Sequence, residues 1–176
     1  MTVTEFRMRF AKLPGNGWLD LGEALILADY ASRTHGDILE VGCHYGRSTA
    51  LLASINLERI VHCVDPWGDE FVRPAKGDDI FESFKQNVVH FPCVRIHRMN
   101  VEEWNPRPVG FAYLDGDHTY RGTITQIVKA QKCNPTIIAV HDVNDSGGGL
   151  EVKRACLELL GPWNERVNRL AVWRVK

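Results

Sequence analysis

The sequence predicts an α/β fold, a doubly wound and mostly parallel sheet with helices on both faces. Short apolar runs alternate with longer segments of helical periodicity along the chain, and this alternation favours parallel strand pairing. The stretch from Asp37 to Ala53 reads as a buried strand, a glycine turn and a helix. At 176 residues the chain has the length of a single domain with one core, which we assign to residues 1–176.

The N-terminal part precedes the first strand. Residues 1–16 mix apolar and basic side chains and end in Leu13-Pro14-Gly15-Asn16, a turn signal, so we expect a loose arm there. Residues 18–32 have helical periodicity, and Gly36 closes that segment. Residues 1–35 therefore predict an arm followed by a helix that covers the first strand.

The remaining elements alternate along the chain. Strands are expected at residues 38–41, 60–64, 94–99, 109–114 and 136–140, and helices at residues 47–57, 80–88, 120–132 and 150–160. Asp78 is the expected N-cap of the helix at 80–88, and Gly147-Gly148-Gly149 is expected to be a flexible joint. Residues 163–167 and 170–175 predict two short strands with Asn168-Arg169 as a tight connection.

Composition and charge exclude several classes of partner. The formal net charge is −1, so no global field attracts nucleic acid or an anionic membrane, and no basic groove with interleaved aromatic side chains indicates nucleic acid. The sequence has no run of 18 apolar residues and no signal peptide, so we expect a cytoplasmic protein with no membrane partner. The five cysteines are odd in number and share no C-x-x-C spacing, which predicts reduced packing residues.

The glycine turn after the first strand predicts a small-ligand site. Small ligands bind at the carboxyl ends of strands in an open α/β sheet, and glycines there let the backbone approach a ligand. The pattern Gly42-x-x-x-Gly46-Arg47 lacks one element of the dinucleotide motif G-x-G-x-x-G and one of the phosphate-binding P-loop. The full pattern from Glu40 to Ser48, E-x-G-x-x-x-G-x-S, resembles the first motif of S-adenosylmethionine-dependent methyltransferases, especially small-molecule O-methyltransferases of the catechol type. The alternative is an ordinary turn in another nucleotide-binding fold.

The second strand ends at an acidic residue. Asp65 lies nineteen residues after Gly46, the usual offset for a carboxylate that accepts hydrogen bonds from a ribose diol. The alternative is that Asp65 caps a helix or turn. Trp67 has three open roles: stacking on adenine, forming the floor of the acceptor pocket, or packing under the loop. The resemblance places Asn100 and Val101, at the end of the third strand, against the adenine ring.

The segment Asp115-Gly116-Asp117-His118-Thr119-Tyr120 is the second specific motif. It resembles the D-G-x-H-x-Y sequence of one branch of the methyltransferase family, at the end of the fourth strand. Family geometry would put His118 beside the transferring methyl group, so we expect it to act as general base if the enzyme works without a metal, with Asp117 or Asp115 fixing its tautomer. Two alternatives stay open: His118 hydrogen-bonds cofactor or backbone, and Thr119 and Asp117 cap the following helix.

The resemblance spans the chain from Gly36 onward and implies a fold, a cofactor and a reaction. The fold is a Rossmann-like, seven-stranded sheet with strand order 3-2-1-4-5-7-6 and an antiparallel seventh strand. The reaction is methyl transfer from S-adenosylmethionine to an oxygen of a small-molecule acceptor, with His118 and Asp115 as catalytic residues. The cofactor-binding residues that we expect from the resemblance are Glu40, Gly42, His44, Tyr45, Gly46, Ser48, Asp65, Trp67, Asn100, Val101 and Asp115.

Two aspartates at the ends of neighbouring strands predict a metal site. The carboxylates of Asp115 and Asp142 should converge, an arrangement that suits a hard divalent cation such as magnesium. Catechol-type relatives bind the metal with two aspartates and an asparagine, and the matching positions here are Asp115, His141 and Asp142. His141 departs from that pattern, because imidazole is a poor ligand for magnesium and a good one for zinc, iron or nickel. Whether a metal binds, and which metal, stay open.

Two other functions stay open at this stage. A Rossmann-type, NAD-dependent oxidoreductase is one, although the middle glycine of the dinucleotide motif and a Tyr-x-x-x-Lys pair are missing. A non-catalytic module that binds an adenosine ligand is the other, because the short N-terminal part has few residues with which to wall off a substrate. A second subunit in a homodimer would supply that wall.

Overall fold

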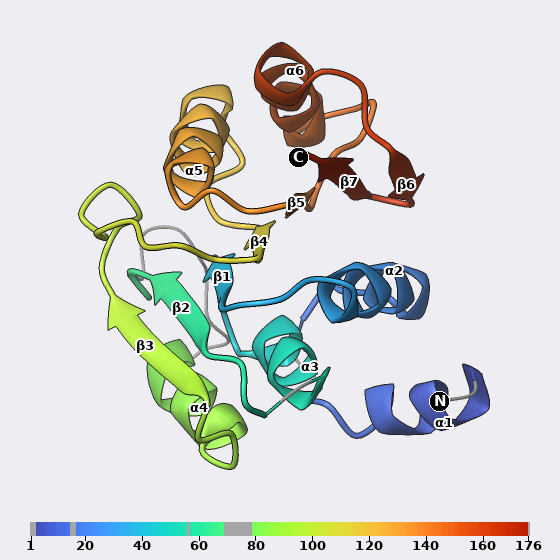
Figure 1. The fold of residues 1–176 in the computed structure, drawn as a ribbon, viewed down its shortest axis with the longest axis vertical. Coiled ribbons are helices and arrows are strands. Elements are labelled where there is room, and N and C mark those ends of the chain that lie inside the picture. Colours follow the sequence, from blue (N-terminus) through green and yellow to red (C-terminus); the bar gives the residue numbers. More distant parts are fainter. Residues whose placement is uncertain (1–2, 15–16, 56, 69–78, 176) are drawn as a thin grey trace.

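Seven strands form one sheet in the order β3-β2-β1-β4-β5-β7-β6 (Figure 1). The computed structural model describes residues 3–14, 17–55, 57–68 and 79–175. In this part of the chain the strands are β1 (Ile38–Val41), β2 (Val61–Asp65), β3 (Val94–Arg98), β4 (Phe111–Leu114), β5 (Ile137–Val140), β6 (Glu165–Val167) and β7 (Leu170–Arg174). The helices are α1 (Val3–Phe10), α2 (Leu21–Ser32), α3 (Arg47–Ile55), α4 (Ile80–Val88), α5 (Tyr120–Lys132) and α6 (Gly148–Leu160). The expected fold class and strand order are confirmed.

Strand β1 lies in the middle of the parallel part of the sheet. It pairs in parallel with β2 and with β4, and all four of its residues are buried. The register places Val41 beside Val64 on one side and beside Leu114 on the other. The carboxyl ends of β1, β2 and β4 therefore meet at one edge of the sheet, where ligands bind in open α/β folds. Strand β7 runs antiparallel to both β5 and β6, as expected for the closing strand.

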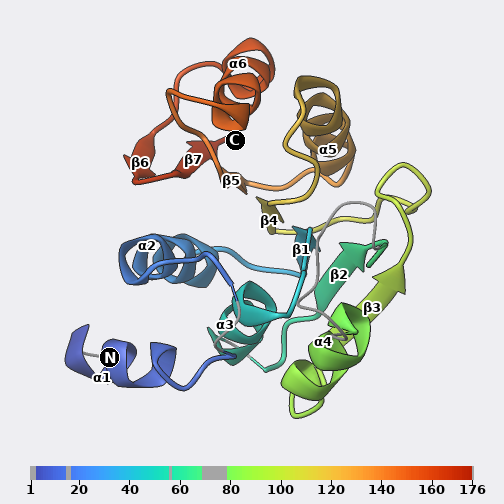
Figure 2. The same ribbon diagram turned by 180° about the vertical axis from the view of Figure 1, so that it is seen from behind.

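Helices cover both faces of the sheet (Figures 1 and 2). Helices α1 to α4 lie on one face, and α5 and α6 lie on the other. Each face has its own apolar core, one around Leu27, Leu52 and Phe84 and the other around Ile127 and Trp173. The five cysteines are buried and free, in agreement with the packing role that the sequence predicts. Among the described residues, none of the helices has the length and apolar character needed to cross a membrane.

The expected loose arm is wrong for the described part of residues 1–16, because Val3–Phe10 forms helix α1. Phe6 is buried in the core, and the guanidinium of Arg47 lies over the ring of Phe10 at 4.2 Å. Arg47 also donates a hydrogen bond of 2.6 Å to the carbonyl oxygen of Pro14. The two phenylalanines are one helical turn apart, so the segment presents an apolar side to the core.

Three helix N-termini differ from expectation, and several strands begin or end one or two residues from the expected positions. Helix α2 begins at Leu21 rather than at 18, because Asp20 caps it in a reciprocal capping box with Glu23. The N-cap of α4 is Asp79 rather than Asp78, which lies outside the described residues. Gly148 and Gly149 belong to helix α6 instead of forming a flexible joint.

Two histidines lie side by side on β2 and β3, on the face that α5 and α6 cover. The Nδ1 atom of His62 is 3.2 Å from Nε2 of His97, and its Nε2 atom is 3.3 Å from a carboxylate oxygen of Asp37. Burial lowers the pKa of His62 despite the opposing effect of Asp37. Burial and the neighbouring His62 lower the pKa of His97 in the same way. Both imidazoles are therefore held neutral in the folded protein at pH values where an unfolded chain would protonate them.

We expect His62 and His97 to make the folded protein less stable in mild acid. An unfolded histidine takes up a proton as the pH falls through 6.5, whereas these folded histidines resist it, so the unfolded state binds more protons. Other buried groups titrate in the same range, so the effect is the difference between variant and wild type: as the pH falls from about 7 to about 5.5, the free energy of unfolding of His62→Gln should rise relative to that of wild type. Urea unfolding at both pH values measures this difference. His90→Gln, at an exposed position after α4, serves as the control and should titrate as wild type does. An identical pH dependence in His62→Gln would contradict the assignment.

Candidate functional site

An open cleft lies at the carboxyl ends of β1, β2 and β4. Its volume is about 1140 Å³, and its walls come from the glycine turn, the ends of β2 and β3, the loop after β4 and residues 17–19. The predicted site residues that line it are Gly42, His44, Tyr45, Ser48, Asp65, Asn100, Val101, Asp115 and His118. The two specific sequence motifs therefore share one cavity.

Position 42 requires glycine because the backbone at the end of β1 lies against the backbone at the end of β4. Its φ is +83°, and a Cβ atom there would lie 2.2 Å from the carbonyl oxygen of Asp115. Gly46, with φ of +86°, faces Phe84 and Val88 of α4, where a Cβ atom would lie 3.0 Å from either side chain. Gly46 does not line the cleft, so packing against α4 accounts for this glycine, contrary to the expected approach of backbone to ligand.

Asp65 joins the glycine turn to the end of β2. Its carboxylate accepts hydrogen bonds from the backbone N–H groups of Cys43 at 2.7 Å and His44 at 3.0 Å. It also accepts a bond of 2.6 Å from the N–H of Trp67. A carboxylate has about four acceptor positions, so these bonds leave capacity for a further donor in the cleft. The structure thus adds a turn-fixing role to the ribose-binding role predicted for Asp65.

Glu40 lies beneath the cleft, not in its wall. It is fully buried, and it accepts hydrogen bonds from the hydroxyls of Ser48 at 2.5 Å and Thr49 at 2.6 Å. Burial raises the pKa of Glu40 to about 7, although both hydroxyl bonds act in the opposite direction. Glu40 therefore fixes the start of α3 under the cleft, and its cofactor-binding role stays a prediction.

Trp67 takes the packing role among its three open alternatives. The ring is buried against Phe81 and Phe84, with centroid distances of 5.0 and 4.6 Å, and it is not among the residues that line the cleft. Its indole N–H donates a hydrogen bond of 2.9 Å to the carbonyl oxygen of His44. Trp67 therefore supports the glycine turn from behind, and the direct cofactor contact expected of it does not follow from its position.

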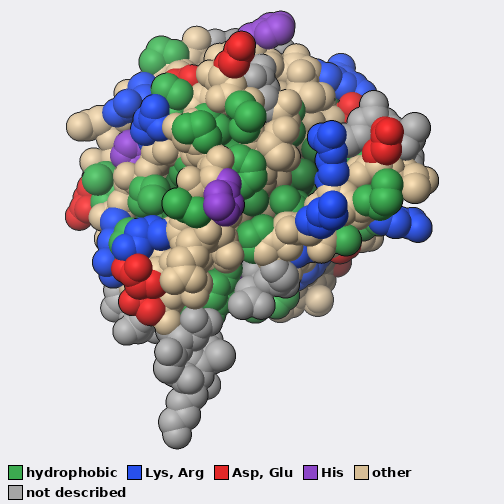
Figure 3. Space-filling view, turned by 90° about the horizontal axis from the view of Figure 1, so that it is seen from below, with side chains coloured by type: hydrophobic (Ala, Val, Ile, Leu, Met, Phe, Trp, Pro, Cys, Tyr) green, Lys and Arg blue, Asp and Glu red, His purple; other side chains and the backbone are tan. Residues whose placement is uncertain are grey.

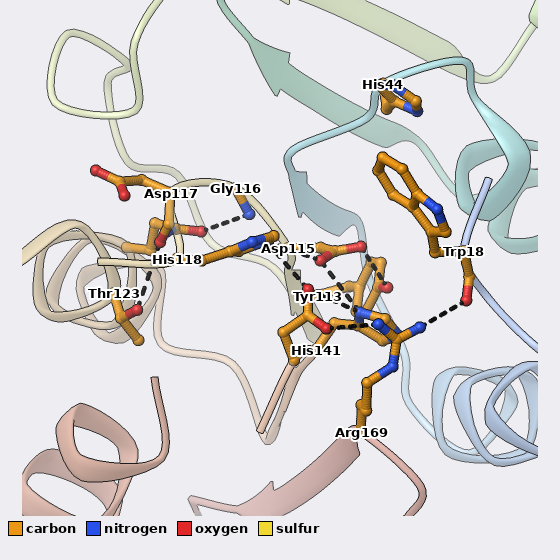
Figure 4. Close-up of polar contacts among 12 residues, drawn as sticks. Trp18, His44, Tyr113, Asp115, Gly116, Asp117, His118, Thr123, His141 and Arg169 are labelled. Atoms are coloured by element: carbon orange, nitrogen blue, oxygen red, sulfur yellow. Dashed lines mark hydrogen bonds and ion pairs between the residues drawn. The ribbon is translucent and has the colours of Figure 1, made fainter. Parts of the chain in front are cut away.

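Asp115 and His118 lie at the other end of the cleft (Figure 4), and Asp142 contacts His118 there. The Nε2 atom of His118 lies 3.4 Å from a carboxylate oxygen of Asp115 and 3.4 Å from one of Asp142. The hydrogen bond to Asp115 raises the pKa of His118, with burial acting against it. The side chain of His118 is 46% exposed, so solvent or a ligand can reach it. Asp115 and Asp142, and not Asp117, are therefore the carboxylates that contact this imidazole.

His141 is enclosed by carboxylates on both ring nitrogens. Nε2 lies 3.1 Å from Glu23, and Nδ1 lies 3.3 Å from Asp115 and 3.6 Å from Asp142. Burial acts against the charged imidazole, but these carboxylates, with Asp115 first, outweigh it and raise the pKa of His141 to about 12. An imidazolium has no lone pair to offer a metal. The metal role of His141 stays a prediction, and His118 is the histidine whose ligand atom lies with those of Asp115 and Asp142.

The predicted hexapeptide divides between the cleft and the helix that follows it. Thr119 is the N-cap of α5 and accepts a hydrogen bond from the N–H of Gly122 at 3.0 Å, which confirms the capping alternative for this residue. The hydroxyl of Tyr120 donates to Glu158 at 2.5 Å, and its N–H donates to Glu151 at 2.9 Å. Tyr120 therefore joins α5 to α6 rather than acting in the cleft.

Three residues of the site were missed from the sequence. Glu23 is fully buried and bonds to His141, although the D-x-x-E capping pattern at Asp20 was visible as a signal. Trp18 lines the cleft, is 71% exposed, and stacks on His44 with a centroid distance of 5.3 Å. Arg169 donates a hydrogen bond of 3.0 Å to Asp142 from the turn between β6 and β7. No local sequence pattern identifies the last two.

The sequence and structure resemble known methyltransferases. A family model described as "Methyltransferase domain" matches residues 39–143, more than half of the chain. No protein of curated function matches the sequence.

Solved structures share the fold. CalS11, a TDP-rhamnose 3′-O-methyltransferase of calicheamicin biosynthesis, is 17% identical with a TM-score of 0.63, over 98% of this chain and 92% of that chain. The O-methyltransferase from Bacillus cereus, solved with S-adenosylhomocysteine, is 15% identical with a TM-score of 0.64, over 97% and 88%. A proposed RNA methyltransferase from Pyrococcus horikoshii is 15% identical with a TM-score of 0.66, over 97% and 96%. At such identities the likeness shows the fold alone.

Because Gly42 lies so close to the backbone of Asp115, we expect even alanine at position 42 to destabilise the protein. We expect Gly42→Ala to lower the free energy of unfolding by about 2 kcal/mol or more, from left-handed backbone strain and the clash with Asp115. Chemical denaturation measures this loss. Gly148→Ala is the matched control, because a Cβ atom there meets nothing within 4 Å and should cost no stability. A Gly42→Ala variant as stable as wild type would show that the strand ends do not approach so closely.

Proposed function

Because the chain belongs to the methyltransferase-domain family and is therefore an S-adenosylmethionine-dependent methyltransferase, we propose that it transfers the methyl group to a hydroxyl oxygen of a small molecule. Family membership excludes the NAD-dependent oxidoreductase and the non-catalytic module that the sequence had left open. The proposal concerns the acceptor and the residues that act on it.

The observation that carries the proposal is a single cleft with two chemically different ends. The glycine turn and Asp65 lie at one end, and Asp115 and His118 lie at the other, with Asp142 beside them. S-adenosylmethionine would lie along the first end, with its methyl group directed toward the second. The sulfonium methyl is already activated, so the main task of the protein is to hold the acceptor oxygen in line with it.

His118 is the group that we assign to remove the acceptor proton. Its Nε2 atom faces Asp115, so a proton on Nε2 would leave the Nδ1 lone pair to accept the proton of a hydroxyl. Asp115 would then stabilise the imidazolium that forms, as carboxylates do in other His–carboxylate pairs. Half exposure at the edge of the cleft leaves the imidazole within reach of an acceptor.

The same three residues also fit a divalent metal. Asp115, His118 and Asp142 each offer a ligand atom, and these atoms lie within 4.8 Å of one another. Two carboxylate oxygens and one imidazole nitrogen suit zinc, iron or nickel better than magnesium. A bound metal would lower the pKa of an acceptor hydroxyl. In that case His118 would be a ligand and could not also be the base.

A small-molecule acceptor fits the surface better than a nucleic acid does. The net charge is −1, and the face in Figure 3 carries Lys and Arg side chains in separate groups among hydrophobic ones, not as a continuous basic surface. The cleft is of the size that encloses a cofactor together with a small ligand. A homodimer that closes this cleft stays a prediction.

Methyl transfer to a hydroxylated small molecule is the direct test. We expect wild-type protein to release S-adenosylhomocysteine from S-adenosylmethionine with caffeate, a phenol, or with TDP-rhamnose, the sugar substrate named for CalS11. Mass spectrometry of the product identifies the methylated atom. A structured RNA transcript is the contrasting acceptor, and methylation of RNA in preference to both small molecules would overturn the proposal.

The role of His118 is tested in the same assay. If His118 is the general base or a metal ligand, His118→Ala should lower kcat by about 10²- to 10⁴-fold. The affinity for S-adenosylhomocysteine should stay nearly unchanged. Calorimetry measures that affinity, and His90→Ala, far from the cleft, is the matched control. Turnover in EDTA separates the two roles: full activity assigns the base, and loss restored by added metal assigns the ligand. A wild-type kcat in His118→Ala would contradict both roles, general base and metal ligand.

A further inference from the structure

Arg169, in the turn between β6 and β7, contacts the site from outside both sequence motifs (Figure 4). Its Nη1 atom donates a hydrogen bond of 3.0 Å to Oδ1 of Asp142. Its Nη2 atom donates a bond of 3.1 Å to the carbonyl oxygen of Trp18. One guanidinium therefore joins the second residue after β5 to the segment that precedes α2.

The backbone of Arg169 has hydrogen bonds of its own, and Nε of its side chain also lies 3.9 Å from Oε1 of Glu23. Its N–H donates a hydrogen bond of 3.0 Å to the buried carboxylate of Glu23. Its carbonyl oxygen accepts a bond of 2.8 Å from the N–H of Val143. These backbone bonds would persist in an alanine variant, so the guanidinium can be removed while the turn stays in place.

Asp142 depends on an external partner for its orientation. Its φ is +56°, a left-handed conformation that costs free energy in a residue other than glycine. With Oδ1 bonded to Arg169, Oδ2 is the oxygen that lies 3.4 Å from Nε2 of His118 and 3.6 Å from Nδ1 of His141. The bond to Arg169 thus selects which oxygen of Asp142 faces the cluster.

Trp18 is the second element that Arg169 holds. The indole lines the cleft and stacks on His44 with an interplanar angle of 19°. Figure 4 shows Trp18 and His44 on one side of the site and His118 on the other. Because Arg169 bonds to the carbonyl oxygen of Trp18, it fixes the backbone from which this wall of the cleft projects.

We infer that Arg169 is a positioning residue for methyl transfer, which holds Asp142 toward His118 and the Trp18 wall over the cleft at the same time. Two acceptors on separate segments require two donors in fixed geometry, which a guanidinium supplies and a lysine ammonium does not reproduce. The expected effect on turnover rests on the proposed function, whereas the effect on Trp18 rests on the geometry alone.

The first measurement needs no acceptor. The protein labelled with 5-fluorotryptophan gives a fluorine NMR signal for each of its five tryptophans, and Trp18→Phe assigns the signal of Trp18. We expect Arg169→Ala to shift or broaden the Trp18 signal and added methylguanidine to reverse part of that change. Arg166→Ala is the matched control. Arg166 lies on the same β6–β7 hairpin as Arg169, but its side chain contacts Asp145 and the carbonyl oxygen of Asn168 instead of Asp142 and Trp18.

The second measurement is turnover with caffeate or TDP-rhamnose. We expect Arg169→Ala to lower kcat about tenfold or more, with KM for S-adenosylmethionine within about twofold of wild type, because misplaced groups slow the reaction without weakening cofactor binding. Arg169→Lys should lie between Arg169→Ala and wild type, methylguanidine should restore part of the rate of Arg169→Ala, and Arg166→Ala should match wild type.

Either an unchanged Trp18 signal or a wild-type kcat in Arg169→Ala overturns the inference. If Arg169→Ala does not fold, Arg169→Lys carries both measurements, and a wild-type result in either has the same consequence. If wild-type protein methylates neither probe, the proposed function fails separately, and the fluorine signal alone decides whether Arg169 positions the cleft.

Discussion

The close approach of Gly42 to the carbonyl group of Asp115 is the contact on which the arrangement of the site depends. Parallel pairing puts Val41 beside Leu114, so the next residues of β1 and β4 leave the sheet side by side. A Cβ atom at residue 42 would fall inside the partner backbone, which only glycine avoids. The turn after β1 and the loop after β4 therefore open into one cleft, which brings the two sequence motifs together.

A buried set of charges fixes the second end of that cleft. Glu23, His141 and Asp115 lie in a row with contacts of 3.1 and 3.3 Å, and two of the three are almost fully buried. Buried charges are tolerated when each has a partner, and removing one leaves the others uncompensated. Because Glu23 comes from α2 and His141 from the end of β5, this row also fixes the covering helix to the edge of the sheet.

Much of the glycine-turn motif supports the cleft from behind. Glu40 holds the first turn of α3, Gly46 admits α4, and the indole of Trp67 bonds to the turn from below. Asp65 both supports the glycine turn, by accepting three backbone hydrogen bonds, and lines the cleft. A sequence motif of this kind therefore describes a backbone shape as much as a set of ligand contacts.

The sequence by itself determined the two motifs that meet in the cleft, because apolar periodicity and glycine spacing are local properties. The strand order came from the family resemblance that those motifs carry. The sequence did not determine which histidine faces the cleft: His118 and His141 both contact Asp115 and Asp142, and the carboxylate of Glu23 encloses His141 on its other side. That contact spans 118 residues, and the bond between Arg169 and Glu23 spans 146. Such partners are chosen by the packing of α2 and the β6–β7 turn against the sheet, a tertiary arrangement that no local pattern records.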